Sequence, residues 1–152
     1  MTLPSDSFRT EHADLKGHLF YLETVVASLE AASREERRRA TTEMVRFLRS
    51  QLAEHAAWEE SVLYPLVDRQ AGHGEPFTAA MRHEHEIIER WTQELVDEIS
   101  CSPINVGRFA RKAEKLLGLL LAHFECEEEV LLPILDRTMT PEQFESEVTA
   151  HA

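Results

Sequence analysis

The chain has 152 residues, 43% of them hydrophobic, with only five glycines and six prolines. That length suits one domain with a single core, and the abundance of Ala, Leu, Glu and Arg predicts an all-α class, because these side chains lose little entropy in a helix. The formal net charge of −12 excludes general electrostatic attraction to nucleic acid or to an anionic membrane surface as the basis of function.

The remaining composition predicts a cytoplasmic protein that does not enter a membrane. Two cysteines, Cys101 and Cys126, are too few for a disulfide framework. Residues 1–6 have neither the basic nor the apolar part of a secretory signal. No apolar run approaches the length of a membrane span.

The first half of the chain predicts a helical hairpin. Apolar residues at helical spacing predict a first helix from near Ser5–Ser7 to about Glu30. Ser33 is expected to be the N-cap of a second helix, since Glu36 three residues later completes a capping box. This second helix should continue to about Tyr64, and Pro65 should disturb or end it, since proline lacks a donor and clashes with the preceding turn.

The second half of the chain predicts another helical hairpin. The segment 71–76, Ala-Gly-His-Gly-Glu-Pro, is the clearest loop. Its proline suits a first helical position, so a third helix is expected over Phe77–Ile99. Ser102 is expected to cap a fourth helix with Pro103 just inside it, and that helix should stop near Pro133.

A short terminal helix completes the expected all-α architecture. Thr140-Pro141-Glu142-Gln143 is a further capping box and opens a helix over roughly 140–150. Short links between long amphipathic helices favour an antiparallel up-down-up-down four-helix bundle over roughly 6–135. We therefore expect a single domain over residues 1–152.

An internal repeat relates the two hairpins. Residues 55–65, His-Ala-Ala-Trp-Glu-Glu-Ser-Val-Leu-Tyr-Pro, align with residues 123–133, His-Phe-Glu-Cys-Glu-Glu-Glu-Val-Leu-Leu-Pro. Glu11-His12 likewise aligns with Glu84-His85. Each copy therefore brings a Glu-His pair on its first helix and a His-x-x-x-Glu motif on its second.

The repeated motif has the spacing of a metal site. His55 and Glu59 are four residues apart, as are His123 and Glu127, so each pair lies on one helix face. Imidazole with carboxylate suits iron, manganese or zinc. A single His-x-x-x-Glu is weak evidence, because on a helix it is usually a solvated pair.

The expected heights of the histidines strengthen the metal prediction. Counted from the expected turns, His12 and His55 differ by about one helical turn, at about 1.5 Å per residue, and so do His85 and His123. All four imidazoles can then lie at one level of the bundle. The predicted metal ligands are His12, His55, Glu59, His85, His123 and Glu127.

These motifs resemble the hemerythrin-like family of the histidine–histidine–glutamate cation-binding type, over roughly residues 8–133. The resemblance implies a four-helix bundle around a carboxylate-bridged non-haem pair of iron ions, with zinc or manganese as alternatives. It also implies that the protein binds or reacts with dioxygen, nitric oxide or peroxide. By position, the terminal ligands would be His12, His55, His85 and His123, and the bridging carboxylates would be Glu59 and Glu127.

Two departures bear on the implied function. Oxygen carriers of this family have a further histidine at the position of Met81, and His83 points elsewhere on the helix. The loss of that nitrogen ligand favours sensing, redox or weak peroxide or oxidase-type chemistry over oxygen carriage. The carriers also place their fourth-helix carboxylate one residue later, so Glu128 competes with Glu127. Glu89 is a weaker candidate.

The sequence leaves one other interpretation open and disfavours another. The first is a metal-dependent regulatory or iron-sensing interaction module without turnover, in which the terminal helix moves and a homodimer or another protein is the partner. The second, a ferritin-like di-iron site, is disfavoured because no glutamate has a histidine three residues later.

Several neighbouring residues allow two interpretations each. Tyr64 is interpreted as a packing residue, with a phenolate ligand as the alternative. Cys126 is either a small core residue or a redox-sensing thiol. Trp58 and Phe124 are expected to shield the site from water. The residues expected on the surface or in loops are His18, His73, His83 and His151, together with the charged helix start 34–39.

Overall fold

The first helical hairpin largely follows the expected boundaries. The structure is a computed structural model that describes residues 2–72 and 76–150. Helix α1 spans Asp6–Ser28. The capping box at the start of the next helix is confirmed, since Ser33 and Glu36 exchange hydrogen bonds of 2.7 and 3.3 Å. The second long helical segment comprises α2 (Arg34–Phe47), η1 (Leu48–Leu52), α3 (Ala53–Trp58), η2 (Glu59–Leu63) and α4 (Tyr64–Ala71), where η marks a π-helical stretch.

The helix is disturbed just before Pro65, as expected, but it does not end there. The helix continues as α4 and ends at Gly72, whose φ of 69° is a left-handed conformation that favours glycine. Pro65 follows η2 directly, and the Tyr64 N–H bonds to the carbonyl of Glu59, five residues back. The wider π turn relieves the clash that proline makes with the preceding turn, and a first-turn position needs no donor.

Pro133 behaves in the same way, so the fourth helix does not stop there either. It follows η3 (Glu127–Leu131) and lies in α7 (Leu132–Thr138). The two prolines are thus tolerated for one physical reason at repeat-equivalent positions.

The second hairpin starts later at both helices than expected. Helix α5 spans Ala79–Ser100, with Pro76 in the preceding turn. Helix α6 spans Val106–Cys126, and its cap is Asn105, whose side chain accepts from the Arg108 N–H at 3.0 Å. The expected cap at Ser102 is therefore wrong: Asn caps as well as Ser does, and here it is the residue that reaches the helix start.

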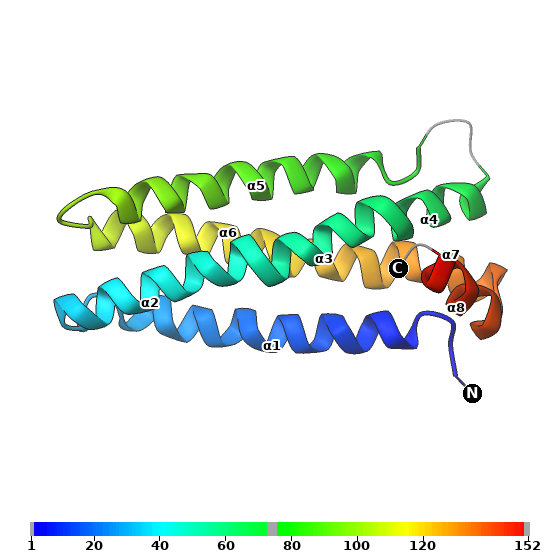
Figure 1. Cartoon of the computed structure of the whole chain (residues 1–152), viewed down its shortest axis with the longest axis horizontal. Helices are drawn as coiled ribbons and strands as arrows, with labels where there is room; N and C mark the ends of the chain where they lie inside the picture. The colour runs from blue at the N-terminus through cyan, green and yellow to red at the C-terminus, as the bar shows by residue number, and fades with distance from the viewer. Residues whose placement is uncertain (1, 73–75, 151–152) are drawn as a thin grey trace.

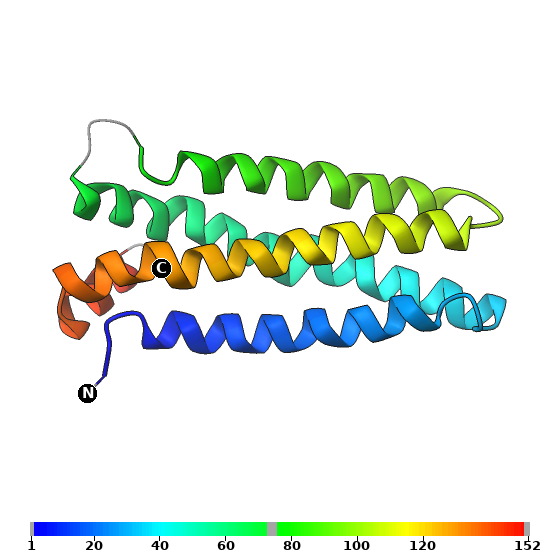
Figure 2. The same ribbon diagram turned by 180° about the vertical axis from the view of Figure 1, so that it is seen from behind.

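Helix α8 (Pro141–Ala150) opens with the expected capping box, in which Thr140 and Gln143 exchange hydrogen bonds of 2.8 and 3.3 Å. Every regular element in 2–72 and 76–150 is helical, which confirms the all-α class. In Figures 1 and 2, α1, the segment from α2 to α4, α5 and α6 lie side by side, with α8 at the end where α1 begins. None of the described helices is both long and apolar enough to cross a membrane.

Two hydrophobic clusters fill the interior. The larger holds residues such as Leu19, Leu95 and Phe109, all at 0% exposure, toward the end away from the termini. The smaller lies at the terminal end and holds Phe8 and Phe144. Along every long helical segment the polar side chains predicted as ligands fall between these clusters. The bundle therefore has one buried polar layer between two apolar ones.

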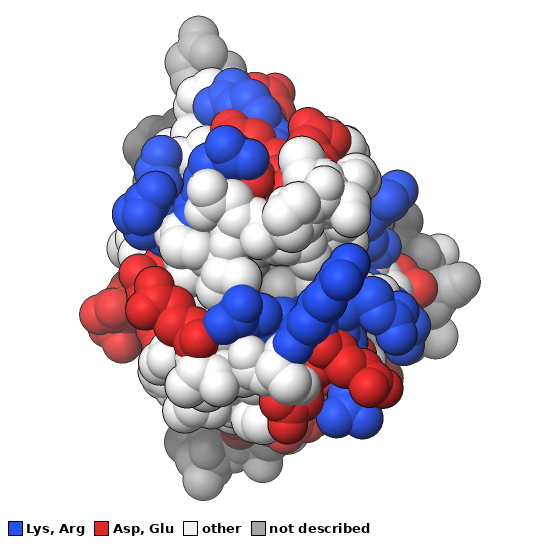
Figure 3. All heavy atoms as spheres, turned by 90° about the vertical axis from the view of Figure 1, so that its left-hand side faces the viewer, with Lys and Arg blue, Asp and Glu red and all other residues white. Residues whose placement is uncertain are grey.

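The surface at the far end carries both signs of charge. Figure 3 views the molecule from the end where α2 begins, and shows basic and acidic side chains interspersed on that face. Residues 34–39 are exposed except for Arg37. They form a solvated helix start, as expected.

Candidate metal centre

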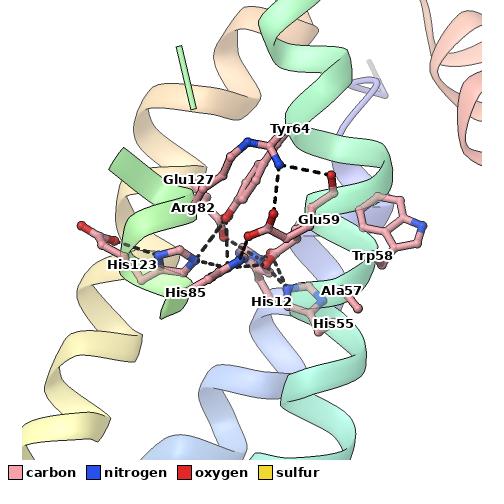
Figure 4. Close-up of polar contacts among 12 residues, drawn as sticks. His12, His55, Ala57, Trp58, Glu59, Tyr64, Arg82, His85, His123 and Glu127 are labelled. Carbon is pink, nitrogen blue, oxygen red and sulfur yellow. Dashed lines mark hydrogen bonds and ion pairs between the residues drawn. The ribbon is translucent and has the colours of Figure 1, made fainter. Parts of the chain in front are cut away.

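All six predicted ligands meet in the buried polar layer. Five of them are at most 5% exposed, and His85 is half-buried. Figure 4 shows them pointing toward one another from different helices. Helix α1 supplies His12, α3 supplies His55, η2 supplies Glu59, α5 supplies His85, α6 supplies His123 and η3 supplies Glu127.

One histidine pair faces one oxygen of each inner glutamate. The Nε2 atoms of His12 and His55 are 3.0 Å apart. Glu59 Oε1 lies 2.7 Å from His55 Nε2 and 3.5 Å from His12 Nε2. Glu127 Oε2 lies 3.4 Å from His12 Nε2.

The second histidine pair faces the other two oxygens. The Nε2 atoms of His85 and His123 are 3.0 Å apart. Glu59 Oε2 lies 3.1 Å from His85 Nε2, and Glu127 Oε1 lies 3.5 Å from His123 Nε2. Both carboxylates thus lie between the two pairs, with one oxygen toward each, as a bridging carboxylate would.

Each histidine is oriented from behind by a carboxylate on its Nδ1. These four outer glutamates flank the ligands in sequence: two precede a histidine ligand and two follow an inner glutamate. The contacts are Glu128 to His12 (3.2 Å), Glu11 to His55 (3.0 Å), Glu60 to His85 (2.9 Å) and Glu84 to His123 (2.8 Å). A carboxylate accepts, so each Nδ1 donates, and every Nε2 lone pair faces the pocket in the neutral imidazole.

The inner atoms are therefore mostly acceptors, and one of them has no donor. Glu127 Oε2 is buried without a hydrogen-bond partner in the described part of the chain. Two facing imidazole lone pairs 3.0 Å apart repel unless a cation or proton lies between them. Nitrogen and oxygen donors in this arrangement suit one or more transition-metal cations, and two such groups occur: His12, His55 and Glu59, and Glu59, His85, His123 and Glu127.

Tyr64 packs in the smaller apolar cluster, as expected, and its hydroxyl is in addition part of this site. Its hydroxyl donates to Glu127 Oε1 at 2.6 Å and lies 3.1 Å from His85 Nε2 and 3.4 Å from His123 Nε2. Met81, where the carriers have an extra histidine, is buried in the same cluster as Tyr64. The polar side chain that lies beside His85 and His123, in addition to the inner glutamates, is therefore the tyrosine Tyr64.

The two inner carboxylates have pKa values displaced in opposite directions. Burial and the charge of Glu59 raise the pKa of Glu127 to about 10. Burial also opposes the ionisation of Glu59, but hydrogen bonds from His12, His55 and His85 outweigh it and hold its pKa well below the ordinary value. Without metal, the pocket thus keeps Glu59 ionised and Glu127 protonated.

Two histidines of the metal-free pocket, His55 and His85, bind a proton more readily than a free imidazole does. Burial lowers the pKa of His55 and His85, but their contacts with Glu59 and the outer glutamates reverse this, and both pKa values are raised. Burial lowers the pKa of His123. Protons thus occupy places that a cation would take, so metal uptake should release them.

A polar clamp fixes the start of α1 beside the site. The Ser5 hydroxyl donates to Asp136 Oδ1 at 2.8 Å, and the Arg9 guanidinium bonds Asp136 Oδ2 at 3.2 Å and the carbonyl of Glu128 at 3.2 Å. Lys16 bonds the Glu128 carboxylate at 2.7 Å. The outer partner of His12 is thus held at both its main chain and its side chain.

The other half of the chain repeats the clamp with equivalent residues. The Thr78 hydroxyl donates to Asp68 Oδ2 at 3.0 Å, and Arg82 bonds the Thr78 hydroxyl at 3.3 Å. Arg82 also bonds the Glu60 carboxylate at 2.9 Å and its carbonyl at 3.4 Å, and lies over the Tyr64 ring. The duplication therefore includes the residues that support the ligands.

The sequence prediction missed the outer glutamates, although the repeat contained the signal. Glu11 and Glu84 are equivalent, and so are Glu60 and Glu128. The competition between Glu127 and Glu128 is resolved by position, since Glu127 points into the pocket and Glu128 contacts the outer nitrogen of His12.

The expected shielding residues lie beside the site. The ring of Phe124 is buried 4.4 Å from that of His12. Trp58 reaches the histidines through Phe8, whose ring stacks on those of Trp58 and His55 at 5.5 and 5.4 Å.

The other residues weighed from sequence lie outside the pocket. Cys126 is exposed, so it is not a core residue. Partial burial of its thiol group and the nearby carboxylates raise the pKa of the thiol. The exposed residues include His18, His83 and Glu89; His73 and His151 lie outside the described residues.

Comparison with known proteins agrees with the geometry. A protein-family model described as the hemerythrin HHE cation binding domain matches residues 3–135. No significant match was found among curated proteins or among solved structures.

Proposed function

The chain belongs to the hemerythrin HHE cation-binding family, and from this premise we propose that its polar layer holds two iron ions bridged by Glu59 and Glu127. Zinc or manganese would fit the same donor types. The observation that supports the pair is the placement of one oxygen of each inner glutamate toward each histidine pair. The proposed scaffold is an antiparallel up-down-up-down four-helix bundle, which brings ligands from every long segment to one level.

Residues around the six ligands would orient them and adjust their chemistry. The outer glutamates fix the imidazole orientation and raise ligand basicity. The Tyr64 hydroxyl donates a hydrogen bond to Glu127 Oε1 at 2.6 Å and adds an oxygen beside His85 and His123. The apolar clusters cover the layer on its two sides along the bundle.

A ferrous pair would supply electrons to a small oxidant such as dioxygen, nitric oxide or peroxide. The proposed role is sensing or redox chemistry in the cytoplasm, with weak peroxide or oxidase-type activity, rather than reversible oxygen carriage. Support comes from the tyrosine hydroxyl beside the second histidine pair, where the carriers have an additional nitrogen ligand and this chain has Met81.

The visible spectrum of freshly isolated protein tests the proposal. A ferric pair in this donor set absorbs in the near-ultraviolet and visible, and reduction should bleach the absorption. Air should restore it. If the isolated protein is colourless and contains zinc, zinc is the metal of this site and not iron. If it is colourless and takes up no iron on reconstitution, the iron pair is refuted.

Removing one outer carboxylate should weaken metal binding without disturbing the fold. For Glu84→Gln we expect a loss of about 10–100-fold in metal affinity, because a neutral amide replaces the charged acceptor that orients His123 and raises its basicity. Competition with a chelator measures the affinity. Glu86→Gln is the matched control, since Glu86 contacts only the exposed His83 among the histidines; equal losses in both variants would contradict the assigned role.

A second candidate function, a metal-dependent regulatory module, is favoured by one set of contacts. The Phe8 ring lies 4.2 Å from that of His12 and 5.4 Å from that of His55. Phe144, at 2% exposure the buried residue of α8, belongs to the same cluster as Phe8. Packing at the metal site is therefore continuous with the terminal helix.

Metal removal should then loosen α8. We expect proteolytic cleavage in 139–150 to become about fivefold faster or more in the chelated protein, since local opening competes with packing that the metal supports. Limited proteolysis with mass spectrometry measures this. Cleavage near residues 29–33, at the far end, is the internal control, and equal acceleration there would indicate general unfolding instead.

A further inference from the structure

A cavity of about 480 Å³ opens beside the proposed metal site, between α3, α5 and α6. Its lining includes His55, Glu59, His85 and His123 at the metal level. This volume is that of a pocket for an organic molecule and is far more than a diatomic ligand requires.

Away from the metal level the buried part of the cavity wall is mainly apolar, and the polar residues Arg49, Glu89 and Gln93 that also line the cavity are exposed. Leu48, Leu52, Ile88, Leu120 and Phe124 line it. Leu48 lies seven residues before the ligand histidine of its helix, so the cavity extends about 10 Å along the bundle at about 1.5 Å per residue. Its shape suits a linear apolar chain that ends at the metal layer.

The duplication shows why there is space here. In the alignment that pairs the two His-x-x-x-Glu motifs, Ala56 is equivalent to Phe124, whose ring is 1% exposed. In the alignment that pairs the two Glu-His motifs, Thr92 is equivalent to Leu19, which is fully buried. Leu19 is buried in one half of the bundle, and Phe124 packs against His12 there while it also borders the cavity. Their small or polar counterparts, Ala56 and Thr92, leave the space in the other half.

Charge decides which end of a ligand lies inward. Two divalent cations would bring four positive charges against the two inner carboxylates, and bound cations are the largest local charges in such a site. Glu60, Glu86 and Glu89 also line the cavity, but they are partly or fully exposed, so water screens their charges. Arg49, at the outer end, is exposed and its charge is largely screened. An anionic oxygen group should therefore face the metals.

We propose that this cavity is the binding site for a linear organic molecule with an apolar chain and one terminal oxygen-anion group, which is directed toward the metal pair. This inference rests on the proposed function for the direction of the head group. The chain-binding walls do not depend on it.

Isothermal titration calorimetry of the zinc-loaded full-length protein tests the proposal with octanoate as probe. Zinc avoids redox chemistry, and metal per chain is measured in the same samples. We expect octanoate to bind at least tenfold more tightly than acetate, which has the head group without the chain. Equal affinities, or no octanoate binding, would overturn the proposal and leave the metal site standing.

Two variants fill the cavity with the residues that the other half uses. Ala56→Phe and Thr92→Leu should each weaken octanoate binding at least tenfold while metal content stays unchanged. Ala122→Phe, at an exposed position of α6 that does not line the cavity, is the matched control. Should Ala56→Phe fail to fold, Thr92→Leu alone decides, because its counterpart shows that leucine fits such a position. Undiminished binding in both filled variants would overturn the proposal.

A protein that takes up no metal would refute the proposed function separately. In that case binding of 1-octanol, which needs only the apolar walls, is measured by the same calorimetry. Binding that Thr92→Leu weakens at least tenfold would support the chain site, and binding that the variant leaves unchanged would overturn it.

Discussion

The variant Glu59→Gln/Glu127→Gln should lose its metal ions entirely under conditions in which the unchanged protein binds about two per chain. An amide offers a neutral oxygen where each carboxylate presents two charged ones to two histidine pairs. Removing one outer glutamate is expected to lower metal affinity about 10–100-fold. Removing the charge of both inner carboxylates should therefore lower metal affinity more than about 100-fold. Metal analysis after reconstitution measures the stoichiometry.

Matched controls for this double variant lie next to the site on the same helices. Glu54→Gln and Glu125→Gln remove the same number of charges from exposed positions. They should retain full metal content. Metal content that survives in the Glu59/Glu127 variant would exclude the proposed bridging role.

The single variant Glu127→Gln should stabilise the metal-free protein and weaken the metal-bound one. In the metal-free fold the pKa of Glu127 is raised to about 10 from an ordinary 4.5. Between these values the folded state holds a proton that the unfolded state has lost, so the free energy of unfolding falls as pH rises. Glutamine resembles the protonated acid and has no such dependence.

The gain from Glu127→Gln should therefore grow with pH. At 1.36 kcal/mol per pKa unit, the difference in unfolding free energy between variant and unchanged protein should increase by about 2–4 kcal/mol from pH 5 to pH 8. Urea denaturation in the presence of a chelator measures it. With metal bound, the unchanged protein should be the more stable at pH 8. A stability difference that does not change with pH would contradict the raised pKa.

The sequence predicted the helices and the ligand layer well because both depend on periodicity. Helical spacing aligned the His-x-x-x-Glu motifs, and the repeat brought His12 and His85 to the same height. The two capping boxes were also predictable, since a cap is a contact between residues three apart.

The features that the sequence did not predict depend on contacts between distant segments or on a change of helical pitch. Pro65 was expected to disturb or end its helix and Pro133 to end its own, but the preceding π-helical turns accommodate both prolines and the helices continue. Tyr64 could not be assigned to the pocket, because a tyrosine on a buried helix face packs in most settings. Its hydroxyl is identified as part of the site only by its contacts with Glu127 and His85.

Two of the four outer glutamates bond a histidine of the other half of the chain. Glu60 of the first hairpin orients His85 of the second, and Glu128 of the second orients His12 of the first. A hairpin expressed alone would hold two imidazoles, one of which lacks its hydrogen-bond acceptor. Two copies of a single ancestral hairpin, associated about a twofold axis, would have had every contact of this kind before gene fusion joined them. Metal capture in such an ancestor would have required dimerisation, and fusion would have made it independent of protein concentration.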